Sequence, residues 1–359
     1  MVQRSQRQVI DEILSDFEER KRGRRRLENI WRQNIKFYNG EQQIGVDYGW
    51  QIDEVFNHIG PIVENRLGIL AEIKPEIKNE VVRKILDRIH FNKTIEIGNF
   101  WQEVTGSVFY KVILKDCDIS VVACSPFEIY PDKLDVGDMN EVKSVIHAKN
   151  VDGRLRIEKW DRKNLTIIGE HLNSKKQKDF EILYRGKIPF EFPFIRGTSE
   201  IMAGHFFGKS VVERAIPVQK AYNAIKNRKQ EFINRLACGI LIVEDGSTDI
   251  DSLETTGLCP GKIIVYKEGT KTPEFMPQSS MPECLAREEE KLLDEFSMIT
   301  SGGDIITKVA GRANIGEGTL SILSEQMRLR LRRPIQSIEN IYKEVEEKII
   351  VNLSIKGDK

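Results

Sequence analysis

Residues 208–239 read GKSVVERAIPVQKAYNAIKNRKQEFINRLACG, and this stretch determines how the rest of the chain is organised. From Val211 to Ile225 its apolar residues recur at steps of four and three, the spacing of one face of an α-helix. Gly239 follows this stripe, and glycine readily ends a helix. The pattern predicts a long amphipathic helix over 208–238, which Pro217 either kinks or starts.

A second long helix is expected after a short β-rich segment. Residues 239–280 combine β-formers with turn signals rich in Gly, Asp and Pro. Pro282 then stands where a first-turn proline is tolerated, and apolar residues from Leu285 to Ile299 keep a helical spacing. Two long helices therefore bracket a small module.

The remaining segments predict an α+β fold. The apolar pattern of 56–70 predicts a core-facing helix, and short β-rich runs within 105–197 predict a mixed, mostly antiparallel sheet. Residues 302–319 are rich in Gly and Thr without a period, which predicts an exposed loop. A last helix is expected from Leu320 to Leu353, with a kink at Pro334.

The composition excludes several classes of protein. The 359 residues carry 55 Lys and Arg against 55 Asp and Glu, and 40% are hydrophobic, too many for a disordered chain. No apolar run approaches the roughly 18 residues of a membrane span, and the N-terminus carries no apolar signal core. We expect a soluble, non-secreted protein of about two domains. Zero net charge argues against a protein that coats DNA by counterion release.

Cysteines and histidines show no spacing typical of a metal site. The five cysteines lack a C-x-x-C pair, and the five histidines lack an H-E-x-x-H pattern. We therefore expect a reducing compartment, structural histidines, no metal and no cofactor. These residues are Cys117, Cys124, Cys238, Cys259 and Cys284, with His58, His90, His147, His171 and His205.

A basic run over residues 20–26 has two interpretations. It contains five arginines and Lys21, interrupted by Gly23. Such runs usually form a solvated helix face, but this one could also touch nucleic acid or an acidic partner.

Two motifs suggest an enzyme. Gly208-Lys209-Ser210 matches the end of a phosphate-binding loop, but Ala203 stands where that motif needs glycine. Asp132, Glu141 and Lys143 have the order of a Mg²⁺-dependent nuclease, with Glu141 and Lys143 expected on one face at the start of a strand.

Blocks of sequence in a fixed order carry a family resemblance. They lie at 37–42, 63–68, 125–132, 208–223, 243–247, 257–263, 288–296 and 320–326. Together they resemble the portal proteins of tailed double-stranded DNA bacteriophages over most of residues 35–331. This likeness accounts for Gly208-Lys209-Ser210 and for Pro131-Asp132 without an enzyme.

The resemblance implies a portal fold with a mixed α/β wing, two stem helices that bracket a small α/β clip, and a tunnel loop. The implied boundaries are the wing at 1–207, the first stem helix at 208–238, the clip at 239–280, the second stem helix at 281–301, the tunnel loop at 302–319 and a long kinked helix at 320–359. Because the chain stops at Lys359, we expect a crown to be absent or truncated.

The same resemblance implies a homo-oligomeric ring, normally a dodecamer, at one capsid vertex. Double-stranded DNA would pass through its channel during packaging and ejection. The implied partners are the terminase large subunit, adaptor or tail proteins, and major capsid or scaffold proteins, with no membrane. The implied location is the virion, after assembly in the host cytoplasm. The motor belongs to the terminase, so the chain itself is not expected to be an enzyme.

The resemblance also assigns roles to residues. Lys308, Arg312 and Asn314 are expected to face the tunnel and touch phosphates, although an ordinary solvated loop would look the same. Acids of the clip are expected to dock terminase or an adaptor, or to solvate turns. These acids are Asp245, Asp249, Asp251 and Glu254. The competing functions are a Mg²⁺-dependent nuclease and an architectural DNA-binding protein built on the basic run.

Overall fold

The chain folds into two compact units. The computed structural model describes residues 6–43, 53–115, 118–172, 178–188, 191–238, 241–256, 263–275, 282–300, 325, 328–329 and 331–357. The first unit contains Met1–Glu41, Asn57–Ile216 and Phe296–Lys359, and the second contains Gln42–Phe56 and Pro217–Glu295. Helices and antiparallel sheets both contribute, so the predicted α+β class is confirmed.

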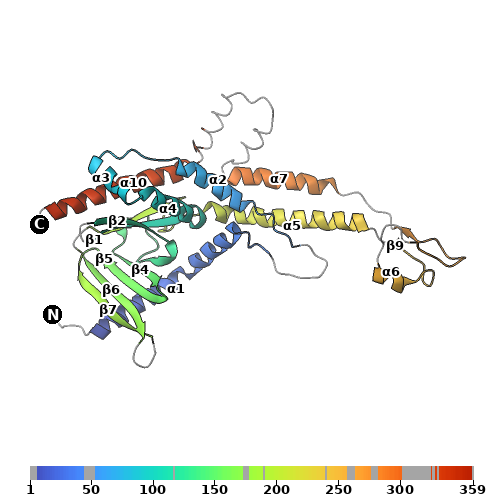
Figure 1. Cartoon of the computed structure of the whole chain (residues 1–359), viewed down its shortest axis with the longest axis horizontal. Coiled ribbons are helices and arrows are strands. Elements are labelled where there is room, and N and C mark those ends of the chain that lie inside the picture. Colours follow the sequence, from blue (N-terminus) through green and yellow to red (C-terminus); the bar gives the residue numbers. More distant parts are fainter. Residues whose placement is uncertain are drawn as a thin grey trace. The chain divides into compact units, whose positions relative to one another are not determined.

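The first unit is built on two antiparallel sheets (Figure 1). A three-stranded sheet has the order β2-β1-β8, with β1 Ser107–Lys115, β2 Asp118–Cys124 and β8 Phe194–Thr198. A five-stranded meander follows the chain as β3 Ile129–Pro131, β4 Ser144–Val151, β5 Arg154–Asp161, β6 Asn164–Leu172 and β7 Lys178–Lys187. The β-rich character predicted for 105–197 is confirmed.

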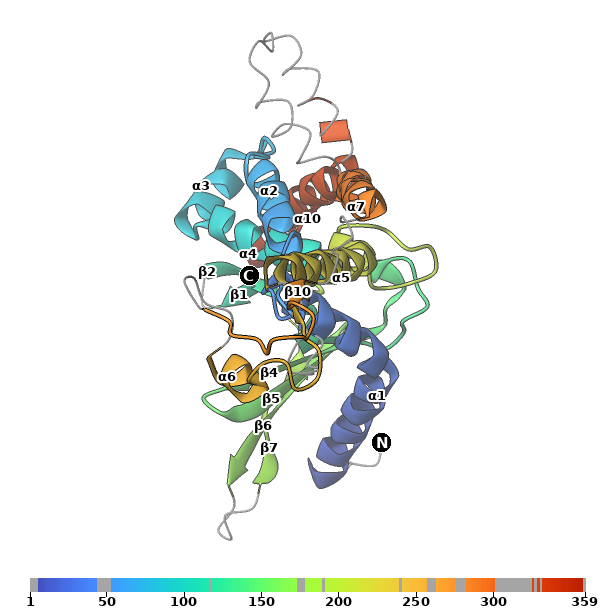
Figure 2. The ribbon, with the colours of Figure 1, turned by 90° about the vertical axis from the view of Figure 1, so that its right-hand side faces the viewer.

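Helices cover both sheets of this unit. They are α1 Gln6–Tyr38, α2 Ile59–Ala71, α3 Glu80–Arg88, α4 Phe91–Thr105 and α10 Arg332–Gly357, with the 3₁₀ turns η1 Pro126–Glu128 and η2 Met139–Glu141. The predicted core helix at 56–70 is α2. The first half of α1 packs through Val9, Ile13 and Phe17 on the five-stranded sheet (Figure 2). A separate apolar cluster joins α2, α3, α4 and α10 to the three-stranded sheet.

The predicted kink at Pro334 stays a prediction, because residues 320–324, 326–327 and 330 of that helix lie outside the described residues. Because α10 begins at Arg332, Pro334 lies in its first turn, where an N–H would have no acceptor inside the helix. The apolar stripe predicted for this segment is confirmed, since Ile338, Tyr342, Val345 and Ile349 are all buried. No helix in the described part of the chain is both long and apolar enough to cross a membrane.

The second unit contains two long helical segments and a small module between them. Helix α5 spans Val211–Cys238 and carries Pro217 inside it, at the boundary between the units. Strand β9 Leu241–Ile242 pairs with β10 Glu274–Phe275, and α6 Ile250–Thr256 lies between them in sequence. Helix α7 then spans Glu283–Thr300. The predicted order of helix, small module and helix is confirmed.

The basic run at 20–26 divides between the two faces of α1. The Arg24 side chain is only 1% exposed, whereas Lys21, Arg22, Arg25 and Arg26 are exposed. The solvated-face interpretation is therefore wrong for Arg24, because the period of α1 turns that residue toward the first unit's core.

Arg24 binds the segment that connects the two sheets. Its guanidinium donates hydrogen bonds to the carbonyl oxygens of Pro126, Phe127 and Ile129, with distances of 2.7 Å to Pro126 and 2.8 Å to Phe127. It also donates to Glu28 Oε1 at 2.8 Å. The planar guanidinium offers five donors, so it can satisfy several buried acceptors at once.

The ring of Tyr130 completes this contact. The Arg24 guanidinium carbon lies 3.6 Å from the ring centroid, within the range of a cation–π interaction. One turn earlier, Arg20 donates to the carbonyl oxygens of Tyr130 and Ser144, at 3.0 Å and 3.2 Å. Two arginines of α1 therefore fix the backbone around η1, β3 and the start of β4.

A buried ion network connects the two sheets. Lys111 of β1 donates to Glu158 of β5, and His147 of β4 lies beside both. Burial by itself would raise the pKa of Glu158, but His147 and Lys111 lower it. Burial would likewise lower the pKa of His147, but Cys124, Glu128 and Glu158 raise it to about 10.

We predict that Arg24→Met destabilises the first unit by about 3 kcal/mol, because it leaves three carbonyls and Glu28 without their buried cation. Arg25→Met is the matched control on the exposed face, and it should change the free energy of unfolding by less than about 0.5 kcal/mol. Urea unfolding of both variants measures the difference. Equal effects would mean that the Arg24 contacts contribute nothing specific.

Candidate functional site

The second unit holds the candidate site, which we call the stem–clip module: α5 from Pro217, α7 to Glu295 and residues 241–275 between them. A charged contact joins the helices. Lys226 Nζ lies 2.9 Å from Glu289 Oε1, and Lys229 Nζ lies 2.8 Å from Glu289 Oε2. Burial by itself would raise the pKa of Glu289, but hydrogen bonds from the two lysines lower it. One carboxylate of α7 thus holds two turns of α5.

A ladder of amide side chains covers another face of α5. Asn227 accepts a hydrogen bond from the Glu54 N–H at 3.3 Å and donates to the Glu54 carbonyl at 3.1 Å. Asn223 accepts from the Phe56 N–H at 3.2 Å, and Gln219 donates to the Phe56 carbonyl at 2.8 Å. The spacing of four residues places the three amides on one helix face. Their side chains bind the backbone N–H and carbonyl groups of Glu54 and Phe56, as the backbone of a neighbouring β-strand would.

The sequence interpretation missed this ladder, although a signal was present. It used only the apolar stripe of α5 and gave these polar residues no role. Gln219, Asn223 and Asn227 follow one another at steps of four, and each side chain can both donate and accept. Their partner segment lies more than 160 residues earlier in the chain, so no local pattern identifies it.

The residues between the helices form very little core. Strands β9 and β10 contain two residues each, and Gly246 makes a tight turn with a φ of +69°. Within 241–275, no apolar side chain that the structure describes is buried. Ile263 and Val265 are 86% and 78% exposed. The segment presents an apolar surface that it does not cover by itself.

The predicted docking acids lie in this segment. Asp245 and Asp249 are exposed in the loop before α6, and Asp251 is exposed in its first turn. Glu254 belongs to α6, but its side chain is outside the described residues. The predicted tunnel residues Lys308, Arg312 and Asn314 also lie outside the described residues. Their roles stay predictions.

Gly208-Lys209-Ser210 comes directly before α5, which begins at Val211, and lies in the first unit. Ser210 is fully buried, accepts a hydrogen bond from the Val212 N–H at 3.0 Å and donates to the Glu103 carbonyl at 2.6 Å. It therefore caps the helix N-terminus. Lys209 pairs with Glu213 at 3.5 Å instead of reaching over the cap.

Backbone packing leaves no room for a phosphate at Gly208. A side chain at Gly208 would lie 2.5 Å from the Gly106 carbonyl oxygen, and one at Gly106 would lie 2.5 Å from the Gly208 carbonyl oxygen. Gly106 also has a φ of +88°, which favours glycine. Both glycines therefore allow two backbone segments to pack closely against each other.

The predicted nuclease arrangement is wrong in its geometry. Glu141 belongs to the 3₁₀ turn η2 and β4 begins at Ser144, so Glu141 and Lys143 do not share a strand face. Asp132 uses its carboxylate to accept hydrogen bonds from the Lys143 N–H, at 3.2 Å and 3.4 Å. This contact closes the turn between β3 and β4.

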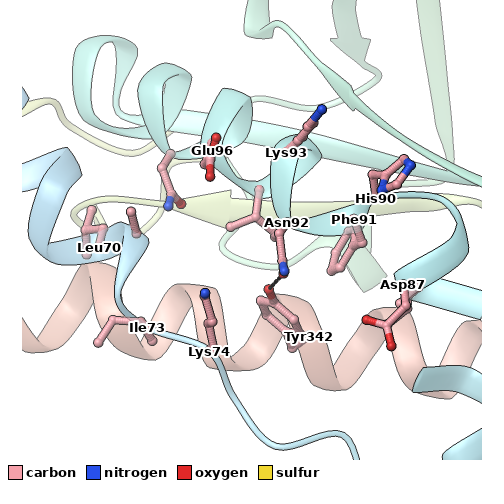
Figure 3. Close-up of a pocket in the computed structure, with 14 residues that line it drawn as sticks. Leu70, Ile73, Lys74, Asp87, His90, Phe91, Asn92, Lys93, Glu96 and Tyr342 are labelled. Carbon is pink, nitrogen blue, oxygen red and sulfur yellow. Dashed lines mark hydrogen bonds between the residues drawn. The ribbon is translucent and has the colours of Figure 1, made fainter. Parts of the chain in front are cut away.

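A cavity of about 470 Å³ lies between α2, α3, α4 and α10 (Figure 3). Apolar residues such as Leu70 and Phe91 line it together with charged groups of both signs. Tyr342 donates a hydrogen bond to Asn92 Oδ1 at 3.0 Å across one side, and burial raises the pKa of Tyr342 to about 12. Asp87 and Lys93 of the lining point apart in Figure 3. The arrangement does not define a reaction.

Comparisons with known proteins give distant likenesses. No protein-family model matches the sequence, and no curated protein matches it. Among solved structures, the chain resembles one of the neck of a native GTA particle computed with C12 symmetry, at 13% identity and a TM-score of 0.45, over 77% of this chain and 74% of that chain. It also resembles one of the virion of a native gene transfer agent (GTA) particle, at 12% identity and a TM-score of 0.43, over 72% and 68% of the two chains. These values place the chain in no family.

We predict that Ser210→Ala lowers the stability of the fold more than Lys209→Ala does, and that neither residue serves to bind ATP. Ser210→Ala removes the cap of α5 and should cost about 1–2 kcal/mol of stability. Lys209→Ala breaks a half-exposed ion pair and should cost less than about 0.5 kcal/mol. Urea unfolding gives both values. A titration with ATP and Mg²⁺ completes the test, and ATP binding that Lys209→Ala abolishes would contradict this assignment.

Proposed function

We propose that this chain is a portal subunit, which forms a ring at one capsid vertex and lets double-stranded DNA pass through a central channel. The observation that carries the proposal is the stem–clip module. Two helices bracket a small segment that has its own strand pair and helix, in the order that the sequence resemblance implies. The proposal assigns 208–238 and 281–301 to the stem, 239–280 to the clip and 1–207 to the wing.

The exposed apolar residues of the clip support a ring of identical copies. A two-stranded pair is marginal in water, and an uncovered apolar surface usually marks an interaction site. The exposed apolar residues here are Ile242, Ile250, Ile263, Val265, Tyr266 and Phe275. The occupant we propose is the same segment of the next copy, because closed rings place one surface of each subunit against a second surface of its neighbour. Twelve copies is the number that the resemblance implies.

The charge balance supports a channel through which DNA slides. A wall that neutralised many phosphates would release counterions and hold DNA tightly. This chain has as many acids as bases, and several of its arginines and lysines are already paired with acids within the fold. Lys308, Arg312 and Asn314 are proposed as the contacts with phosphates in the channel.

A structural role, not an enzymatic one, follows from the proposal. The separate terminase would supply the motor and would dock on the clip acids during packaging, and an adaptor would follow afterwards. Capsid or scaffold proteins would surround the wing. On this view Asp132 is part of the wing's framework and Gly208-Lys209-Ser210 is the start of the first stem segment, as their hydrogen bonds support.

We predict that the purified protein forms rings of about a dozen copies, and that Ile263→Asp with Val265→Asp converts them to monomers or small oligomers. Both residues are exposed within one chain, so these changes should leave the fold of each chain intact. Thr272→Asp adds a charge at another exposed residue of the same segment and should leave the ring whole. Native mass spectrometry with negative-stain images measures both. A wild-type monomer without a ring would contradict the proposal.

A second prediction concerns the channel. Lys308→Ala with Arg312→Ala should leave rings intact and reduce DNA packaging or retention in particles, because phosphate contacts are lost. Packaged DNA per particle is the measurement, with images of the variant rings as the control for assembly. Unchanged packaging by intact variant rings would remove these two residues from the channel wall.

A further inference from the structure

Three side chains with metal-binding atoms meet between the two sheets of the first unit. Cys124 is the last residue of β2, Glu128 ends η1, and His147 lies in β4. The cysteine sulfur, a carboxylate oxygen and a ring nitrogen all lie within 4.8 Å of one another. Cys124 is 2% exposed and His147 is 6% exposed.

The chain path explains why these residues meet. Residues 125–128 form a short link between β2 and β3, so Cys124 and Glu128 stand at its two ends. The register of β3 and β4 then pairs Ile129 with His147, which places the histidine beside the end of that link. Arg24 holds the carbonyls of the same link. The three side chains therefore come from backbone that is fixed in position.

The two ring nitrogens of His147 face different partners. Nδ1 lies 3.5 Å from Glu158 Oε2, and Nε2 lies 3.5 Å from Glu128 Oε2. Nε2 is buried and makes no hydrogen bond within the described part of the chain. A histidine that binds a metal commonly gives its other N–H to a carboxylate, which fixes the ring and its tautomer. With its proton on Nδ1, His147 has this arrangement.

Glu158 is held rigidly for that role. Lys111 donates to Oε2, and Trp160 Nε1 donates to the same oxygen at 3.0 Å. Arg156 Nε lies 3.2 Å from the other carboxylate oxygen of Glu158, Oε1. These contacts keep the carboxylate negative and in place beside the ring.

We propose that Cys124, Glu128 and His147 bind one Zn²⁺ ion, with Glu158 positioning the imidazole. A thiolate, an imidazole and a carboxylate form a donor set that suits Zn²⁺, and harder ions such as Mg²⁺ or Ca²⁺ prefer oxygen alone. A cavity of about 300 Å³ is lined by Cys124 and His147 and offers space for a water as the fourth ligand. The ion would join the two sheets across the 125–128 link.

The competing arrangement is a proton in place of the metal. A protonated His147 between Glu128 and Glu158 would satisfy the same charges, and the other neutral tautomer could accept a hydrogen bond from Lys111, whose Nζ lies 3.3 Å from Nδ1. In both cases the Cys124 sulfur binds no metal, although it lies beside His147 and donates to the Val122 carbonyl at 3.8 Å. Ligation by sulfur therefore distinguishes the metal site from the ion network.

The experiment uses the full chain with Cys124 as its only thiol, the other four cysteines being changed to serine. Co²⁺ replaces Zn²⁺ as a coloured probe, and a thiolate-to-Co²⁺ charge-transfer band should appear at one ion per chain and vanish on adding Zn²⁺. The matched control keeps Cys284, an exposed cysteine of α7, as its only thiol and should give no band. Absence of the band from the Cys124 chain, or an equal band from the control, would overturn the proposal.

A second variant tests the same site without the four cysteine substitutions, so misfolding of the single-cysteine chain cannot decide the result. Glu128 is partly exposed, so Glu128→Gln should fold normally in the otherwise unchanged chain. It should weaken Zn²⁺ binding by at least about tenfold, the loss that even a supporting residue of a zinc site causes. Competition with a chromophoric chelator measures this affinity, and circular dichroism of the metal-free proteins checks the fold. An affinity equal to that of the wild type would also overturn the site. The site does not depend on the proposed portal function.

Discussion

A single buried carboxylate, that of Glu103, is the constraint on which the first unit depends. Glu103 is fully buried on α4, and an isolated charge there would be costly. Arg66 of α2 pairs with one carboxylate oxygen at 2.6 Å, and Ser199, just after β8, donates to the other at 2.9 Å. The backbone carbonyl of Glu103 accepts the Ser210 hydroxyl that caps α5. Burying one charge thus favours one arrangement of α2, α4 and the end of β8, and the backbone carbonyl of the same residue anchors the cap of α5.

The same requirement recurs wherever a charge enters the first unit. Arg24 satisfies backbone carbonyls of the link between the sheets, and Lys111 with Glu158 connects β1 to β5. Removing one member of such a pair leaves a buried charge or acceptor unsatisfied, so each pair strongly favours one arrangement of its elements. Apolar clusters hold these elements together, but the charged contacts select the arrangement.

Sequence periodicity predicted the elements well and their contacts poorly. The apolar residues at steps of four and three in 211–225 predicted α5, and the turn signals of 239–280 predicted the small segment before α7. The burial of Arg24 could not be predicted, because a basic run resembles a solvated face until the helix phase is known. Cys124 and His147 are 23 residues apart without a metal-type spacing, and only the pairing of β3 with β4 brings them together. Contacts that depend on sheet register stay hidden in the sequence.

The two units differ in how much of their stability one chain can supply. Among its described residues, the first unit has large apolar clusters and buried, paired charges. The segment between α5 and α7 has a pair of two-residue strands and no buried apolar side chain among those that the structure describes from 241 to 275. Such a segment cannot offset the entropy of ordering its own backbone by burial within one chain. In the proposed ring, each clip would gain that burial from the next copy, so assembly and the ordering of the clip would be one process.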